Sequence, residues 1–216
     1  MTSATSQPSS RWHIWGIWVS ALVLGLLLGQ FLSAPVRYVE PAPASVSGAD
    51  TVQFSLLDQH GQRASASDFT GRVLLVFFGY THCPDICPTT LLEMREVKAS
   101  LGDSAARFAG IFITVDPARD TSERLLAYID HFDPELIGLT GTDAEIRAAA
   151  NSFGAAYARE QESAGGYLMG HTAFGYLVAA DGTIETVFPN EVGAKEISAA
   201  VAALLQRPET PGAGEI

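Results

Sequence analysis

The strongest constraint on the fold is a pair of cysteines placed between an apolar run and a helix-like segment. Cys83 and Cys87 are the only cysteines of the chain and lie four positions apart. The run 73–79 before them is apolar, β-branched or aromatic throughout, which is typical of a central strand covered on both faces. The segment 88–101 after them has the apolar spacing of a helix. A buried strand that leads through a short loop into a helix predicts an α/β fold, with two thiols at the end of a strand.

The remaining elements alternate between strand and helix patterns. A turn at 58–61 joins a strand to a second short segment, which predicts an N-terminal hairpin, and Asp181-Gly182 predicts another hairpin turn near the C-terminus. The expected strands are 51–57, 73–79, 108–115, 171–179 and 183–188, and the expected helices are 88–101, 122–132, 142–153 and 192–205. Parallel βαβ units come first, and an antiparallel hairpin with a closing helix comes last. This order predicts a thioredoxin-like fold, in which helices flank a central mixed sheet.

An uncharged segment near the N-terminus predicts a membrane anchor. No charged residue occurs between positions 14 and 32, a length that suffices to cross a bilayer, and three tryptophans cluster near its start. A signal peptide is the alternative, so whether the segment is cleaved stays open. The predicted organisation is a cytoplasmic N-terminus (1–11), a transmembrane anchor (12–33), a flexible linker (34–50), a thioredoxin-like domain (51–206) and a disordered tail (207–216). We therefore expect a single-pass protein of a bacterial-type inner membrane, with its domain in the periplasm.

The charge of the chain restricts its partners. A formal net charge of −11 argues against binding to nucleic acid or to anionic lipid surfaces. It suits a basic partner or a cation, although acidity that merely keeps the domain soluble explains it equally well.

The spacing of the cysteines favours a metal site over a simple redox pair. Thioredoxin-type oxidoreductases have two residues between their cysteines, whereas Cys83 and Cys87 are separated by three. Side chains four apart at a helix start can point the same way and leave room for an ion between their sulfurs. Two thiolates suit Cu(I), and Zn(II) competes for such ligands but prefers four of them in a closed site.

A third ligand has to come from one of five histidines. Two have simple structural explanations: His60 lies in a turn, and His131 ends a helix where a cation complements the dipole. His82 adjoins Cys83 but is expected to face the opposite way along an extended chain. His171 follows a glycine-rich loop at the start of a strand, and the local sequence leaves open whether it binds metal. The remaining histidine, His13, lies in the anchor.

Three motifs in this order resemble the Sco/SenC family. They are the segment 78–88 around the cysteines, the segment 114–121 with the sequence TVDPARDT, and His171 shortly before Tyr176-Leu177. Members of this family are membrane-anchored, thioredoxin-fold copper proteins that assist assembly of the binuclear copper site in cytochrome c oxidase. The resemblance covers roughly residues 50–206 and the anchor.

The resemblance implies a copper site and its partners. Cys83, Cys87 and His171 match the family's copper ligands, and copper, as Cu(I) or Cu(II), is the implied metal. The implied partners are the copper-site subunit of cytochrome c oxidase and another copper chaperone as donor. One departure is that Leu168-Met169-Gly170 replaces the acidic residue that the family often has just before the histidine. Asp85 and His82 are candidates for outer-shell or partner contacts, although Asp85 can instead simply complement a helix dipole.

Other functions of the cysteine pair remain open at this stage. A metallochaperone is not an enzyme, but Cys83 and Cys87 could also form the redox-active pair of a thiol-disulfide reductase that keeps the oxidase cysteines reduced. Such a reductase would not need His171. A thiol peroxidase is a third alternative for this fold. A purely structural disulfide is disfavoured, because a bridge between residues four apart closes a very short loop and gains little stability.

Overall fold

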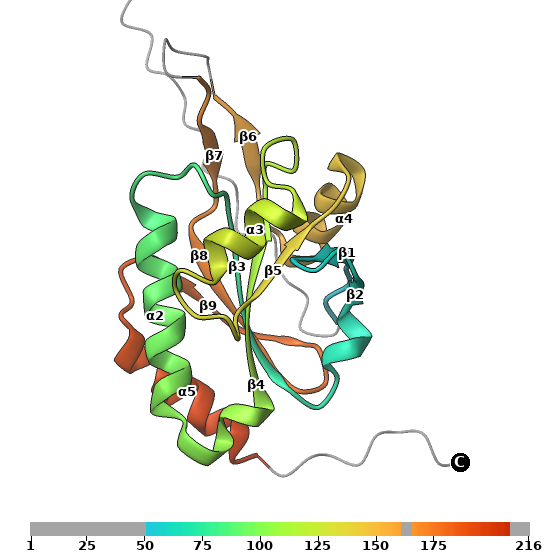
Figure 1. Cartoon of the computed structure of the whole chain (residues 1–216). Helices are drawn as coiled ribbons and strands as arrows, with labels where there is room; N and C mark the ends of the chain where they lie inside the picture. Colours follow the sequence, from blue (N-terminus) through green and yellow to red (C-terminus); the bar gives the residue numbers. More distant parts are fainter. Residues whose placement is uncertain (1–50, 161–165, 208–216) are drawn as a thin grey trace, which may run out of the picture. The chain divides into compact units, whose positions relative to one another are not determined.

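Two sheets and four α-helices make up the part of the chain that the computed structural model describes, residues 51–160 and 166–207 (Figure 1). The strands are β1 (Ser55–Asp58), β2 (Arg63–Ser65), β3 (Val73–Gly79), β4 (Phe108–Thr114), β5 (Ile137–Thr140), β6 (Tyr157–Arg159), β7 (Met169–His171), β8 (Phe174–Val178) and β9 (Ile184–Pro189). The helices are α2 (Ile86–Ser100), α3 (Ser122–Ile129), α4 (Asp143–Phe153) and α5 (Ala194–Leu205), with 3-10 helices η1 (Ala66–Phe69) and η2 (Gly102–Arg107).

The larger sheet is mixed, as the sequence predicts. Its strand order is β2-β1-β5-β4-β3-β8-β9, and β6 pairs only with β7 in a separate sheet. The β3–β4 and β4–β5 pairs are parallel, whereas the outer pairs are antiparallel. Every residue of β3 and β4 is buried, because helices cover these strands on both faces. The two central strands therefore form a rigid base, and the segments that follow them lie together at one edge of the sheet.

Aromatic residues divide the core into two layers. Phe77 and Phe112 lie on the face covered by α2, α3 and α5, where Phe112 also contacts the Tyr128 ring. Phe78 lies on the opposite face and meets the Phe153 ring of α4 edge-on. Alternate residues of β3 thus serve opposite layers, as the period of a strand requires.

Several local predictions are confirmed. Strands β1 and β2 pair antiparallel as the expected N-terminal hairpin. Helix α4 closely matches the expected range 142–153, and Thr142 caps it in a capping box with Glu145. Gly182 takes a positive φ of 88° in the turn between β8 and β9, where glycine is favoured.

The predicted ends of several elements are wrong. Helix α2 begins at Ile86 rather than at residue 88, because a proline in the first turn removes an N–H that has no helical partner anyway. The single strand expected over 171–179 is instead two strands, β7 and β8, which belong to different sheets. Strand β1 begins only at Ser55, α3 already ends at Ile129 and α5 begins at Ala194.

Two short strands were not predicted, and one prediction falls outside the described residues. Strand β5 has four residues and β6 has three, which is too short for a clear alternating pattern. The anchor expected over 12–33, the linker over 34–50 and almost all of the tail expected over 207–216 lie outside the residues that the structure describes. Within the described ranges, no helix has the length and apolar character needed to span a bilayer.

Candidate metal centre

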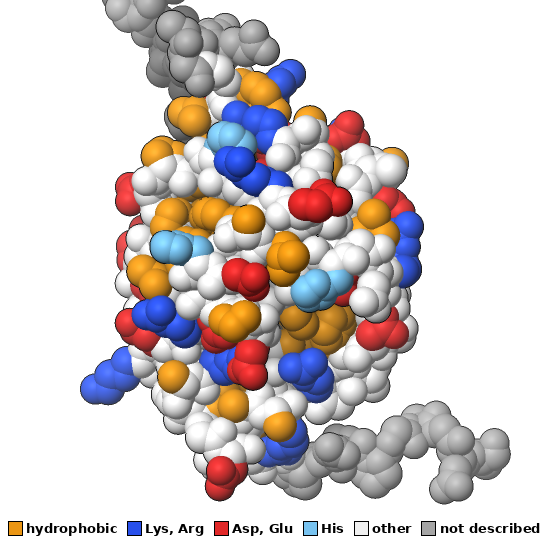
Figure 2. Space-filling model, in the orientation of Figure 1, with side chains coloured by type: hydrophobic (Ala, Val, Ile, Leu, Met, Phe, Trp, Pro, Cys, Tyr) orange, Lys and Arg blue, Asp and Glu red, His pale blue; other side chains and the backbone are white. Residues whose placement is uncertain are grey.

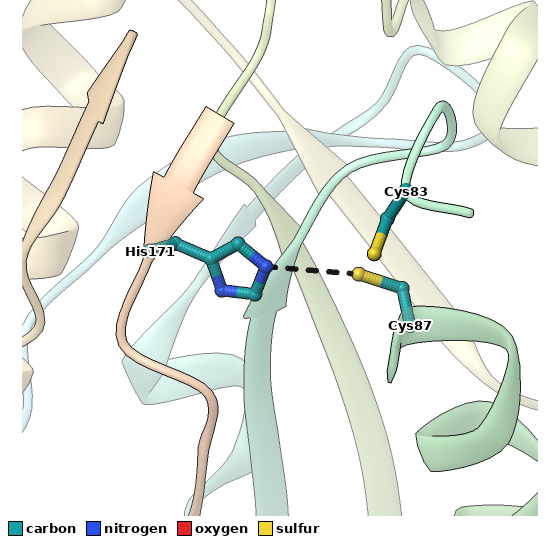
Figure 3. A group of neighbouring side chains, drawn as sticks. All are labelled: Cys83, Cys87 and His171. Carbon is teal, nitrogen blue, oxygen red and sulfur yellow. Dashed lines mark hydrogen bonds between the residues drawn. The ribbon is translucent and has the colours of Figure 1, made fainter. Parts of the chain in front are cut away.

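The two cysteines come from the loop after β3 and from the first turn of α2. Cys83 lies in the loop and is half-buried, whereas Cys87 is the second residue of α2 and is fully buried. Both are free thiols. Figure 3 shows their side chains pointing toward each other from the loop and the helix. The prediction that this spacing aims two sulfurs at one place without joining them is confirmed.

A buried carboxylate fixes the loop that carries Cys83. Asp120 has no exposed surface and accepts hydrogen bonds from the Thr81 main-chain N–H (2.9 Å) and hydroxyl (2.6 Å). It also accepts a hydrogen bond from the Thr114 hydroxyl at the end of β4 (2.6 Å). The next residue, Thr121, caps helix α3. Asp120 instead ties the cysteine loop to the neighbouring parallel strand.

Close packing against the end of β3 holds the Cys87 side chain in place. At Gly79, the last residue of β3, an added Cβ would lie 2.8 Å from Cys87 Sγ and 2.7 Å from the Phe112 ring. Contacts this short are repulsive, so only glycine leaves room for the sulfur at this position.

His171 approaches the cysteines from the small sheet. It ends β7 and pairs with Tyr157 of β6. Its ring meets the rings of Phe77 and Tyr80 edge-on, each at a centroid distance of 5.9 Å. These two rings orient the imidazole so that Nε2 lies 3.8 Å from Cys87 Sγ (Figure 3).

The structure thus assembles the three residues that the sequence singled out. The donor atoms of Cys83, Cys87 and His171 lie within 4.8 Å of one another. Two sulfurs and one imidazole nitrogen suit Cu(I) better than Zn(II), which favours a fourth protein ligand in a closed site. His60 and His131 do not belong to this group.

Hydrogen bonding makes the two thiols electrostatically unequal. A hydrogen bond from the Cys87 thiol holds the pKa of Cys83 well below its usual range, with further help from the His171 ring and despite partial burial. The same hydrogen bond and burial raise the pKa of Cys87. In the metal-free reduced protein, these shifts favour the thiolate at Cys83 and the protonated thiol at Cys87. Binding of a soft ion by both sulfurs would release that proton.

The two candidates for outer contacts lie beside this group. His82 is exposed and turns away from the sulfurs toward Thr81, Asp120 and Arg124, as the sequence suggested. Asp85 is exposed at the start of α2, and its side chain makes no capping hydrogen bond. Basic and histidine side chains gather at this end of the molecule in Figure 2, on a chain that is acidic overall.

Comparison with known proteins identifies the family. The SCO1/SenC family model matches residues 44–206. The chain belongs to the SCO1/SenC family. An SCO2-like protein of Rickettsia felis is 38% identical over 146 residues, which cover 67% of this chain and 71% of that protein.

Two solved SCO1/SenC structures share the fold. The structure of Bradyrhizobium japonicum ScoI with copper bound has a TM-score of 0.67 and 38% identity, and covers 72% of this chain and 99% of its own. The structure of Arabidopsis thaliana ScoI with copper bound has a TM-score of 0.68 and 30% identity, and covers 73% of this chain and 98% of its own. The predicted thioredoxin-like α/β fold is thereby confirmed for the described domain.

Sequence reasoning missed a group of contacts next to β7, the strand that carries His171. Asp116, Arg119 and Tyr167 were not among the predicted site residues. Arg119 forms an ion pair with Asp116, and both residues also contact Tyr167. Only the order Asp-Pro-Ala-Arg-Asp hinted at a structured loop, and nothing in it identifies a partner about 50 positions away.

Proposed function

We propose that this SCO1/SenC protein is a copper chaperone that carries one copper ion, its cargo, on Cys83, Cys87 and His171. The observation that carries the proposal is the convergence of two sulfurs and one imidazole nitrogen within 4.8 Å. The copper-bound ScoI structures of Bradyrhizobium and Arabidopsis support it. The donor set is soft and has only three members, so it binds Cu(I) without closing the coordination sphere.

Unequal exposure of the ligands suits transfer. Cys83 and His171 are partly exposed, whereas Cys87 is fully buried. A thiolate of a partner can therefore join the ion from the side of Cys83 and His171 while Cys87 still holds it. Ligands then exchange one at a time, and the ion is never released into solvent.

Membership of the SCO1/SenC family supports a choice of recipient. We assign the copper-site subunit of cytochrome c oxidase as recipient and another copper chaperone as donor, with Asp85 and His82 as contacts for a partner. An N-terminal anchor in the inner membrane would keep the domain in the periplasm, next to an oxidase in the same membrane.

Copper stoichiometry tests the proposal. The full-length protein is reduced, loaded with Cu(I) under anaerobic conditions and freed of unbound metal, and its copper content is then measured. We expect one copper per wild-type chain and loss or strong weakening in Cys83→Ser, Cys87→Ser and His171→Ala. The matched control is His131→Ala, since His131 is an exposed histidine that packs on Phe132. Uptake that is indifferent to His171 would contradict the three-ligand site.

The asymmetry of the cysteines favours one alternative, a thiol-disulfide reductase. Cys83 is a partly exposed thiolate, and Cys87 is a buried thiol beside it. The Cys83 thiolate would attack a disulfide of the partner and release one of its sulfurs as a thiolate. Cys87 would then lose its proton, attack the mixed disulfide and release the second sulfur. The partner gains two electrons, and a dithiol donor must later reduce the Cys83–Cys87 disulfide.

Substitution of His171 distinguishes the copper chaperone from the thiol-disulfide reductase. A reductase should keep its rate of disulfide reduction in His171→Ala, measured with a small aromatic disulfide and excess dithiol. A copper chaperone should lose copper retention in the same variant. Retained copper together with lost reduction would argue against both assignments.

A further inference from the structure

The sheet that carries His171 is too small to hold its own shape. Strands β6 and β7 have three residues each and pair only with each other in the structure. Isolated two-stranded hairpins are at best marginally stable in water. Figure 1 shows β6 and β7 projecting beyond the end of the large sheet, next to the loops that follow β3 and β4. The position of His171 therefore depends on what ties this hairpin to the body of the domain.

One tie is a cluster of three residues, Asp116, Arg119 and Tyr167, which we call the clamp. Asp116 follows β4, is 3% exposed and forms an ion pair with Arg119 Nε. The Tyr167 hydroxyl donates to the other Asp116 oxygen (2.7 Å). Arg119 Nη1 donates to the Tyr167 carbonyl oxygen (3.0 Å), and its guanidinium carbon lies 3.7 Å from the centre of the Tyr167 ring.

The clamp acts just before the histidine. Tyr167 lies four residues before His171, and β7 begins between them. The guanidinium of Arg119 also lies 5.8 Å from the centre of the Tyr80 ring, which in turn meets the His171 ring edge-on. The same guanidinium thus contacts both the residue that leads into β7 and the ring against which the imidazole rests.

We propose that Arg119 is a positioning residue that docks the β6–β7 hairpin through Tyr167 and so holds His171 within reach of the two cysteines. This inference rests on the proposed copper function, since it concerns a ligand of that ion. A planar guanidinium can serve a carboxylate, a carbonyl oxygen and an aromatic ring at once, whereas a lysine ammonium cannot match this geometry. The side chain is 22% exposed, so water screens these contacts only partly.

The test combines two measurements on the full-length protein. The first is amide hydrogen exchange in the metal-free form. Thr172 N–H, bonded to the Ala156 carbonyl oxygen, reports on the hairpin, and Val115 N–H, bonded to the Gly79 carbonyl oxygen, reports on the large sheet. The second is the rate at which Cu(I) passes to excess chelator. The variants are Arg119→Ala, Arg119→Lys and Tyr167→Phe.

A matched control is Arg95→Ala. Arg95 lies on α2, and its guanidinium also donates to a main-chain carbonyl oxygen, that of Phe132 (3.4 Å), on another part of the molecule. We expect no change at Thr172 and no change in copper release. In Arg119→Ala, both Thr172 exchange and copper release should rise roughly tenfold, with Val115 much less affected. Arg119→Lys should fall between, and Tyr167→Phe should give about threefold, because it loses one hydrogen bond and keeps the ring.

Three results would overturn the proposal. They are unchanged Thr172 exchange in Arg119→Ala, an equal rise at Thr172 and Val115, and a loosened hairpin that releases copper at the wild-type rate. If Arg119→Ala does not fold, the same criteria apply to Arg119→Lys and Tyr167→Phe. If the wild-type protein took up no copper, the proposed function would fail, and the exchange data on metal-free protein would still decide whether Arg119 docks the hairpin.

Discussion

The cysteine side and the histidine side of the metal centre are built differently. Cys87 has no exposed surface and sits at the start of α2, under the end of the central strand β3. His171 stands on a hairpin of two three-residue strands outside the large sheet. Two of the three proposed ligands therefore share the stability of the core, whereas the third has only the stability of its local attachments. The proposed transfer of copper by ligand exchange would gain from this arrangement, because the proposed ligand that can move most easily lies on the least stable element.

The largest loss of stability is expected when the side chain of Asp120, which anchors the cysteine loop, is removed. Asp120→Ala leaves the Thr81 N–H, the Thr81 hydroxyl and the Thr114 hydroxyl without their acceptor. Because the site is fully buried, we expect a loss of about 3 kcal/mol or more in the free energy of unfolding, measured with urea. Asp120→Asn keeps an acceptor oxygen and should lose less. A loss below about 1 kcal/mol in the alanine variant would mean that the cysteine side is less rigid than its burial suggests.

A smaller loss in the stability of the whole domain is expected when Gly79 is substituted. In Gly79→Ala, the new methyl group would press on Cys87 Sγ and on the Phe112 ring, so we expect a loss of about 1–3 kcal/mol in urea unfolding. Gly175→Ala is the control in the same sheet, because its Cβ would meet Leu75 at an ordinary 3.5 Å. Equal effects of the two substitutions would contradict the tight packing under Cys87.

The same division explains what the sequence could predict. The cysteine side is contiguous in sequence: β3 covers 73–79 as predicted, and the loop and helix follow directly. Strand and helix periods describe such segments well, because burial on both faces leaves an unbroken apolar run. Only the start of α2 was misplaced, since Pro88 can occupy the first turn of a helix.

The histidine side could not be predicted in this way. Its strands are too short for a visible alternation, and residues 172–173 interrupt what the sequence presents as one strand over 171–179. Its support is non-local: Arg119 and Tyr167 are 48 positions apart, and Asp116 and Tyr167 are 51 apart. The local pattern could not decide whether His171 is a ligand, and the family resemblance was needed to single it out.

A local effect is expected when the hairpin itself is weakened. The Thr172 hydroxyl accepts from the Ala156 N–H (3.0 Å) and donates to the Ala156 carbonyl oxygen (3.1 Å). Thr172→Val removes both bonds at nearly constant volume, so the hairpin should lose about 1 kcal/mol. We expect faster amide exchange at Glu160 in the hairpin and severalfold weaker Cu(I) retention, with urea unfolding almost unchanged.

The control for this variant lies in another antiparallel pair, β8–β9. The Thr183 hydroxyl donates to Asp181 in the turn between β8 and β9 (2.7 Å). Thr183→Val should leave Glu160 exchange and copper retention at their wild-type values. If Thr172→Val instead lowered global stability by the full amount, the hairpin would unfold together with the core, and the two sides would be one cooperative unit.

The smallest loss of stability is expected at the start of α4. Because α4 is followed directly by β6, this change tests where along the chain the less stable histidine side begins. The Thr142 main-chain N–H and Arg63 lower the pKa of Glu145 at the start of α4 to about 2, from an ordinary value of 4.5. The charged form is thus favoured in the folded state, so its contribution is complete above pH 4.5 and is lost as the pH falls toward 2. The side chain is 32% exposed, so water screens these contacts, and we expect only about 0.5 kcal/mol at neutral pH.

Glu145→Gln should therefore be slightly less stable than wild type in urea at pH 7, and the difference should shrink below pH 4.5 and vanish near pH 2. Glu191→Gln, at an exposed carboxylate, is the control. Amide exchange at Glu160 and Thr172 shows whether the change at Glu145 reaches the hairpin. If the exchange rates stay unchanged in Glu145→Gln, α4 belongs to the stable core and the less stable histidine side begins after Phe153. Faster exchange at both amides would mean that the less stable part of the chain includes α4. Loss of order in the first turn of α4 would then also destabilise β6, the strand that pairs with His171.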